Sequence, residues 1–128
     1  VPFGTIDRGG DSGAELRNSF SITRQDAWEV FWAQHRGPAA VPPAVDFGRD
    51  VVIVAAVGLR QEAGDSVEIR RVIQTTDNTQ VEIFERVPGN FCSPASREHY
   101  PIHIVVAPLT RSPVEFLQVD TIHVPCGL

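Results

Sequence analysis

The residues most suggestive of catalysis lie near the start of the chain, in the sequence Gly10-Asp11-Ser12-Gly13. The same four letters surround the nucleophile in a large class of serine proteases. A serine nucleophile needs a general base within hydrogen-bond distance, a group that orients this base, and donors for an oxyanion. No histidine precedes Ser12, and the chain is too short for the two-barrel fold of that class. We therefore predict a glycine-rich turn, in which Asp11 and Ser12 bond to the local backbone.

Two sets of residues could bind a metal ion. Asp7 and Asp11 share the N-terminal loop, but they lack the spacing and the closing glutamate of a calcium-binding loop. His99 and His103 would share one face of a strand, and His123 could supply a third ligand. Because His103 lies in an apolar stretch, a buried and hydrogen-bonded histidine is the favoured interpretation. The sequence therefore predicts neither a metal ion nor another cofactor.

Carboxylates offer a second route to catalysis. Glu62 and Asp65 flank Gly64, whereas Glu68 and Glu85 alternate with apolar residues, as on the solvent-facing side of a strand. The sequence marks none of these carboxylates as perturbed. Since no set of catalytic residues emerges, we predict that the protein is not an enzyme.

Composition sets the class of molecule. The chain has 128 residues and a formal net charge of −5, a size typical of one domain, so we predict a single domain over residues 1–128. No run of basic residues could follow a phosphate backbone, which makes nucleic acid an unexpected partner. No apolar stretch reaches the roughly 20 residues that cross a bilayer, so we predict no transmembrane segment.

Two cysteines, Cys92 and Cys126, fit no zinc-binding spacing. A disulfide between them would fix the C-terminal tail and stabilise the fold by about 3–4 kcal/mol. Such a bond indicates an oxidising compartment outside the cytoplasm. Two separate, reduced and buried cysteines are the alternative.

The pattern of apolar residues predicts one helix at about residues 24–36. Trp28, Phe31, Trp32 and His35 have helical spacing and should form one buried face. The T-x-x-D sequence that begins at Thr23 predicts that this threonine caps the helix. Gly37 and Pro38 should end it. We expect both tryptophans to lie in the core.

The rest of the chain reads as strands. The apolar run 51–57 does not alternate, which predicts a strand covered on both faces. Residues 66–70 and 81–85 should form a hairpin with a turn at Asp77-Asn78 and a bulge at Arg71. Further strands are expected at 102–107 and at 114–116 and 121–124, the last two as one strand or as a strand pair. The predicted fold is mainly β (α+β): an antiparallel β-sandwich or barrel of about six to eight strands, with the helix packed on it.

Several segments, in this order and spacing, resemble the C-terminal domain of the PrcB family, the protease complex subunit PrcB. The resemblance covers roughly residues 3–117, and its segments are Arg8-Gly9, Ser12-Gly13, Trp28-x-x-x-Trp32, 42–47, 64–69, Pro88-Gly89-x-x-Cys92 and 101–105. It implies a small bacterial domain, secreted or anchored as a lipoprotein, that accompanies a subtilisin-like protease. It defines no catalytic residues.

One loop departs from that family. Where the family usually has R-P-T-G-G-Y, this chain has Arg60-Gln61-Glu62-Ala63-Gly64-Asp65. Loops on a rigid sheet often carry recognition. We therefore predict a partner-binding loop made of Arg60, Gln61, Glu62, Gly64 and Asp65.

These observations together favour a non-enzymatic, extracytoplasmic domain that binds or stabilises a protein partner, with a secreted subtilisin-like protease as the partner that the resemblance suggests. Two alternatives stay open. One is a protease inhibitor that uses loops 58–66 and 88–94. The other is a small-ligand-binding or hydrolytic domain with a pocket beside Trp28 or Trp32.

Overall fold

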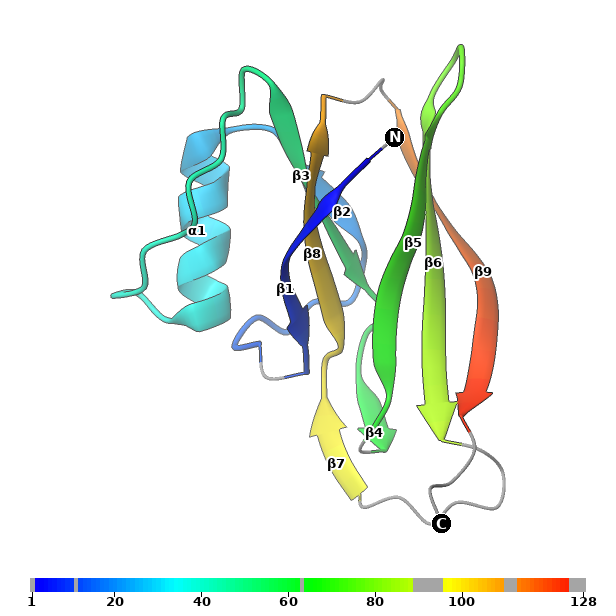
Figure 1. Ribbon diagram of the computed structural model, residues 1–128. Coiled ribbons are helices and arrows are strands. Elements are labelled where there is room, and N and C mark those ends of the chain that lie inside the picture. Colours follow the sequence, from blue (N-terminus) through cyan, green and yellow to red (C-terminus); the bar gives the residue numbers. More distant parts are fainter. Residues whose placement is uncertain (1, 11, 63, 89–95, 110–112, 125–128) are drawn as a thin grey trace.

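The protein was analysed as a computed structural model, which describes residues 2–10, 12–62, 64–88, 96–109 and 113–124 (Figure 1). The described residues form nine strands and one helix, which confirms the predicted mainly β, α+β class. Cys92 and Cys126 lie outside the described residues. The elements are β1 (Gly4–Gly9), β2 (Phe20–Ile22), α1 (Gln25–Arg36), β3 (Asp50–Ala56), β4 (Arg60–Glu62), β5 (Ser66–Gln74), β6 (Thr79–Pro88), β7 (Ser96–His99), β8 (Ile102–Pro108) and β9 (Val114–Val124).

The strands form three sheets. A central sheet has the order β1-β8-β3-β2, an outer sheet has the order β5-β6-β9, and β4 pairs with β7 alone. Neighbouring strands are antiparallel except for β6 and β9, which run parallel over their whole lengths. The expected antiparallel arrangement is therefore correct for every described pair but this one.

The molecule has three layers: α1, the central sheet and the outer sheet (Figure 1). Strands β3 and β8 are covered on both faces, as the apolar run at 51–57 predicted for β3. Val52 and Val54 point toward the helix, whereas Val51 and Ile53 point toward the outer sheet. Two hydrophobic clusters thus share the central sheet as their common wall, which fixes the strands that carry the polar sites described below.

The helix packs through the predicted face, since Trp28, Phe31, Trp32 and His35 are all buried. The Trp28 indole Nε1 donates to the carbonyl of Pro43 at 3.0 Å, which satisfies its polar atom inside the core. The core role of both tryptophans is therefore confirmed.

The predicted cap at the start of the helix is wrong. Arg24 is the N-cap residue and makes no side-chain cap bond, so Thr23 does not cap. The Asp26 carboxylate accepts from the backbone N–H of Ala27 at 2.9 Å instead. The helix ends as expected at Gly37, whose φ of 103° favours glycine.

Strands β5 and β6 form the predicted hairpin. The register shifts between Ile69 and Arg71, so the expected bulge is present. Glu68 pairs with Phe84 across the two strands, and Val67 pairs with Glu85. Since successive side chains point to opposite faces, Glu68 and Phe84 face outward and Val67 and Glu85 face the core.

Candidate functional site

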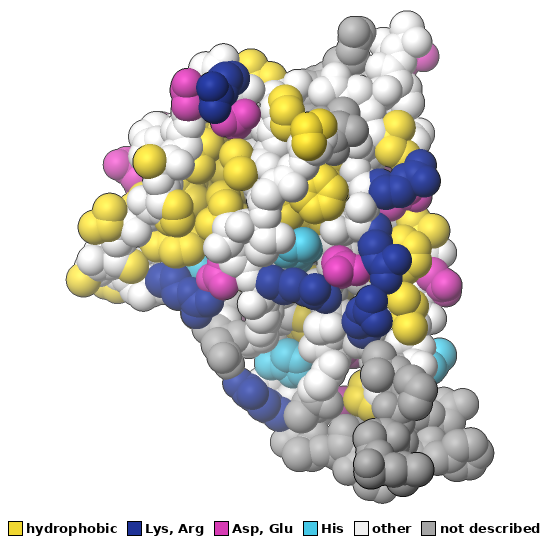
Figure 2. Space-filling model, in the orientation of Figure 1, with side chains coloured by type: hydrophobic (Ala, Val, Ile, Leu, Met, Phe, Trp, Pro, Cys, Tyr) yellow, Lys and Arg dark blue, Asp and Glu magenta, His cyan; other side chains and the backbone are white. Residues whose placement is uncertain are grey.

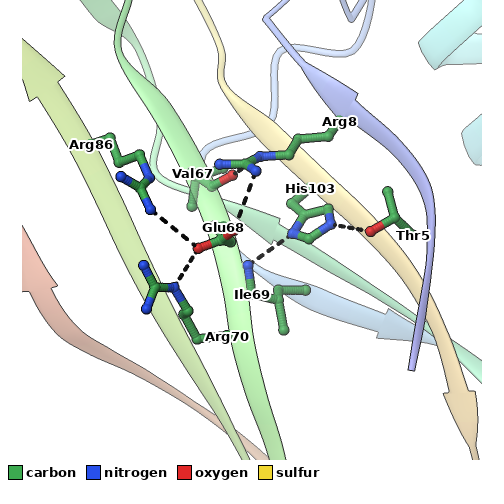
Figure 3. Close-up of polar contacts among 8 residues, drawn as sticks. All are labelled: Thr5, Arg8, Val67, Glu68, Ile69, Arg70, Arg86 and His103. Carbon is green, nitrogen blue, oxygen red and sulfur yellow. Dashed lines mark hydrogen bonds and ion pairs between the residues drawn. The ribbon is translucent and has the colours of Figure 1, made fainter. Parts of the chain in front are cut away.

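Three arginines converge on one glutamate on the outer side of the β5–β6 hairpin (Figure 3). The Glu68 carboxylate lies 3.4 Å from Arg8 Nη1 and 3.9 Å from Arg86 Nη2, and it accepts a short hydrogen bond from Arg70 Nε. Arg8 comes from β1, Arg70 from β5 and Arg86 from β6. We call these four residues the arginine cluster. Its three guanidinium groups outnumber the single carboxylate, so the cluster carries an excess of positive charge.

The arginine cluster is accessible to solvent and is held in place. The side chains of Arg8, Arg70 and Arg86 are 34%, 41% and 37% exposed. Arg8 Nε also donates to the carbonyl of Val67 at 3.0 Å. The Arg70 guanidinium lies 4.7 Å from the ring centre of Phe84, a distance typical of a cation–π contact. Figure 2 shows dark-blue side chains gathered over the hairpin on this face.

The charge state of Glu68 follows from these contacts. Partial burial would raise the pKa of Glu68, but the hydrogen bond from Arg70 and the charges of Arg8, Arg70 and Arg86 outweigh it. The pKa of this carboxyl therefore lies below its usual range. Glu68 is ionised at neutral pH and occupies the arginines as an internal anion.

A buried histidine lies beside the cluster and joins the two sheets (Figure 3). The backbone N–H of Ile69 donates to His103 Nδ1 at 2.8 Å, so Nε2 carries the proton and donates to Thr5 Oγ1 at 2.8 Å. Burial lowers the pKa of His103 to about 4, with the charge of Arg8 adding to the effect. His103 is thus the buried, hydrogen-bonded histidine that its apolar surroundings predicted.

The fold also brings a histidine and an aspartate to Ser12. His35 Nδ1 lies 2.7 Å from Ser12 Oγ, and His35 Nε2 lies 2.7 Å from Asp7 Oδ2. An ionised carboxylate only accepts hydrogen bonds, so Nε2 donates to Asp7 and Nδ1 accepts from the Ser12 hydroxyl. The sequence did not predict this contact, because His35 follows Ser12 in the chain and is brought to it by α1. The predicted turn lies between β1 and β2, and its Asp11 lies outside the described residues.

The surroundings of Ser12 favour a structural role for this arrangement. The nearby backbone N–H groups are already used: Ala14 N–H donates to Ser12 Oγ at 3.1 Å, and Gly13 N–H donates to the His35 carbonyl at 3.0 Å. Burial lowers the pKa of His35 despite its bond to Asp7. A Cβ at Gly13 would lie 2.7 Å from the backbone oxygen of Gln34. The loop is therefore pressed against the end of α1 and joined to it by His35.

The predicted partner-binding loop is split between surface and interior. Arg60 and Glu62 belong to β4, and Gln61, Glu62 and Gly64 are exposed. Arg60 Nε and Nη2 bind the buried Glu85 carboxylate at 2.6 Å and 3.0 Å. Asp65 is only 9% exposed, and Arg60 Nε lies 3.8 Å from its Oδ2. Arg60 and Asp65 therefore serve an internal ion cluster, which leaves Gln61, Glu62 and Gly64 facing solvent.

The internal cluster corrects the expectation that no carboxylate is perturbed. Burial raises the pKa of Asp65 to about 8, and the neighbouring Glu85 acts in the same direction. Burial would also raise the pKa of Glu85, but the hydrogen bond and charge of Arg60 hold it below its usual value. One arginine thus serves two acids, and Asp65 retains its proton at neutral pH. The sequence shows only alternation at Glu85, which does not reveal that the residue faces inward.

The other predicted histidines are placed apart. His99 hydrogen-bonds to the carbonyls of Arg97 and Asp65, at 2.9 Å and 3.1 Å, whereas His123 is exposed on β9. Within the described ranges, no three metal-binding side chains come together as a metal site requires.

Two pockets lie away from the arginine cluster. One, of about 390 Å³, opens between the central and outer sheets. The other, of about 340 Å³, runs along α1 and is lined by Phe20, Val30 and Phe31 among others. Neither Trp28 nor Trp32 lines these two pockets. In the described part of the chain, no helix is long and apolar enough to cross a membrane.

No family model, curated protein or solved structure matches this chain. The geometry of the described residues is therefore the basis for a function.

Proposed function

We propose that the protein is a protein-binding domain whose contact surface is the outer face of the β5–β6–β9 sheet. The observation that carries this proposal is the arginine cluster beside Phe84. Arginine and aromatic residues are the side chains that most often dominate binding energy at protein interfaces. Here they are half-exposed and restrained by one another, so ordering them on binding costs little entropy.

The composition of the outer face supports the same function. Besides Phe84, the side chains of Ile73 and Leu117 are partly exposed on neighbouring strands. Leu117 pairs with Glu82, and both lie on the outward side of the sheet. A partly apolar surface with arginines at its edge is typical of the core and rim of an interface. The extracytoplasmic location and the secreted protease partner remain part of the proposal, on the strength of the PrcB resemblance.

Site-specific photocrosslinking tests this surface. A photoreactive phenylalanine analogue replaces Phe84 in one variant and Val30 in the other, and each variant is expressed in the native cell. Val30 is 61% exposed on α1, in the opposite layer of the molecule. We expect a discrete protein adduct from position 84 and none from position 30. Equal adducts at both positions, or none at position 84, would contradict the proposal.

A hydrolase is the second candidate, because His35 contacts Ser12 with one ring nitrogen and Asp7 with the other. His35 Nδ1 would take the hydroxyl proton of Ser12 and return it to the leaving group. The engaged N–H groups of Gly13 and Ala14 count against it. A fluorophosphonate probe decides this point: labelling that Ser12→Ala abolishes would favour the hydrolase, whereas no labelling would remove it.

A further inference from the structure

We infer that the arginine cluster is a binding site for carboxylates, and that it receives an aspartate- and glutamate-rich segment of the partner protein. This inference rests on the proposed protein-binding function and names the chemistry of its partner. Glu68 is an internal carboxylate that competes with the partner's carboxylates for the three arginines.

The first step is the imbalance of charge. Ion pairs outside the cluster join one arginine to a carboxylate that no second described arginine shares, as for Arg24, Arg36, Arg49, Arg60 and Arg71. Arg71 with Glu82 on the same hairpin is an example, at 2.8 Å. Glu68 is instead shared by three. Within a chain of net charge −5, this leaves one local region with two positive charges in excess. Such a surface attracts anions and repels cations over a distance of about 10 Å.

The second step is the number of free donors. Each guanidinium carries five N–H groups. Arg86 reaches Glu68 only at 3.9 Å, too far for a hydrogen bond, and the described residues supply it with no other acceptor. Arg70 uses Nε for Glu68, and its two Nη groups form no hydrogen bond with the described residues. The cluster can therefore accept at least one further carboxylate without breaking an existing contact.

The third step is the kind of anion. The cluster already holds a carboxylate, so its spacing suits that group. Phe84 adds an aromatic surface beside the charges, onto which an apolar side chain of a peptide can pack. The arginines come from β1, β5 and β6, strands of two sheets, and lie around Glu68 on three sides (Figure 3). All three are partly exposed, so an extended peptide with several carboxylates can contact more than one of them at once, whereas a small ion cannot.

The experiment measures binding of a fluorescein-labelled deca-glutamate peptide by anisotropy at low salt, with deca-lysine as the opposite charge. We expect deca-glutamate alone to bind, and its affinity to fall as salt rises. Arg70→Gln and Arg86→Gln should each weaken binding about two- to fivefold. Glu68→Gln should strengthen it about fivefold, because the internal competitor has lost its charge. Arg71→Gln, on the same hairpin but paired with Glu82, is the matched control and should change affinity less than twofold.

Thermal unfolding of each variant confirms that it is folded before its binding is compared. Absence of deca-glutamate binding, or an unchanged affinity in both Arg70→Gln and Glu68→Gln, would overturn the inference. So would binding to phosphatidylglycerol vesicles without binding to the peptide, since the site would then serve a lipid surface. If the adduct at position 84 persists while deca-glutamate fails, the protein-binding function stands and only the acidic partner is wrong. If both fail, the function itself is wrong.

Discussion

The two faces of the β5–β6 hairpin carry opposite versions of the same chemistry. On the inner face, one arginine, Arg60, serves two buried acids, Asp65 and Glu85. On the outer face, three half-exposed arginines serve one acid, Glu68. Burial makes the inner cluster costly to disturb, because an ion left without its partner inside the protein is strongly destabilising. Exposure makes the outer cluster cheap to rearrange, and this is a property that a binding surface needs.

Removing one arginine from each face is the most direct way to break this comparison. Arg60→Gln should lower the free energy of unfolding by about 3–5 kcal/mol, since it leaves the buried Glu85 carboxylate without its positively charged partner. The same change at Arg86 should cost no more than about 0.5 kcal/mol. Urea unfolding followed by circular dichroism measures both. Similar losses in the two variants would show that the outer cluster is structural.

Acid should destabilise the protein through the interior. The folded-state pKa of His103, about 4, lies below its unfolded value of 6.5. Between these values the unfolded chain binds a proton that the folded chain refuses, so stability falls as the pH drops from 6.5 to 4. The full loss is on the order of 3 kcal/mol. His103→Gln should flatten this part of the curve of stability against pH. An unchanged slope in that variant would assign the effect to other groups.

The ionisation of Asp65 gives a further test of the inner cluster. The folded-state pKa of Asp65, about 8, lies above its unfolded value of 3.8. The folded protein therefore binds the extra proton, and stability falls as the pH rises between these two values. Asp65→Asn removes the ionisation and should stabilise the protein by about 1–2 kcal/mol at pH 9, with little effect at pH 4. Thermal unfolding at both pH values measures the difference. A variant that is less stable at pH 9 would mean that the Asp65 charge is compensated by Arg60.

Much of the fold could be predicted from local sequence patterns. The unbroken apolar run at 51–57 predicted a strand covered on both faces, and the bulge at Arg71 followed from a break in alternation. The parallel pairing of β6 and β9 could not be predicted, because nothing in the sequence of either strand specifies its neighbour in the sheet. The cap failed for a different reason. The T-x-x-D pattern at Thr23 permits a cap, but Arg24 became the N-cap residue in the fold.

The candidate site was harder to predict than the fold. The cluster of Arg8, Arg70 and Arg86 forms only because β1 lies beside the hairpin. No spacing in the sequence predicts this contact. The alternation of Glu68 with Val67 and Ile69 correctly placed Glu68 on a solvent-facing side. Glu85 has the same kind of alternating neighbours and faces the core, so alternation alone cannot tell the two carboxylates apart. Once the hairpin register is known, Glu68 is assigned to the outer face and Glu85 to the inner face.

The parallel pairing of β6 with β9 has a consequence for the order of folding. Strand β8 follows β6 in the chain but lies in the central sheet, and only after it does the chain return to form β9. The outer sheet therefore cannot be completed from neighbouring segments. Since contacts between distant segments slow folding, we expect β9 to pair with β6 later than β5 does, and the edge of β6 that β9 covers to be exposed until then.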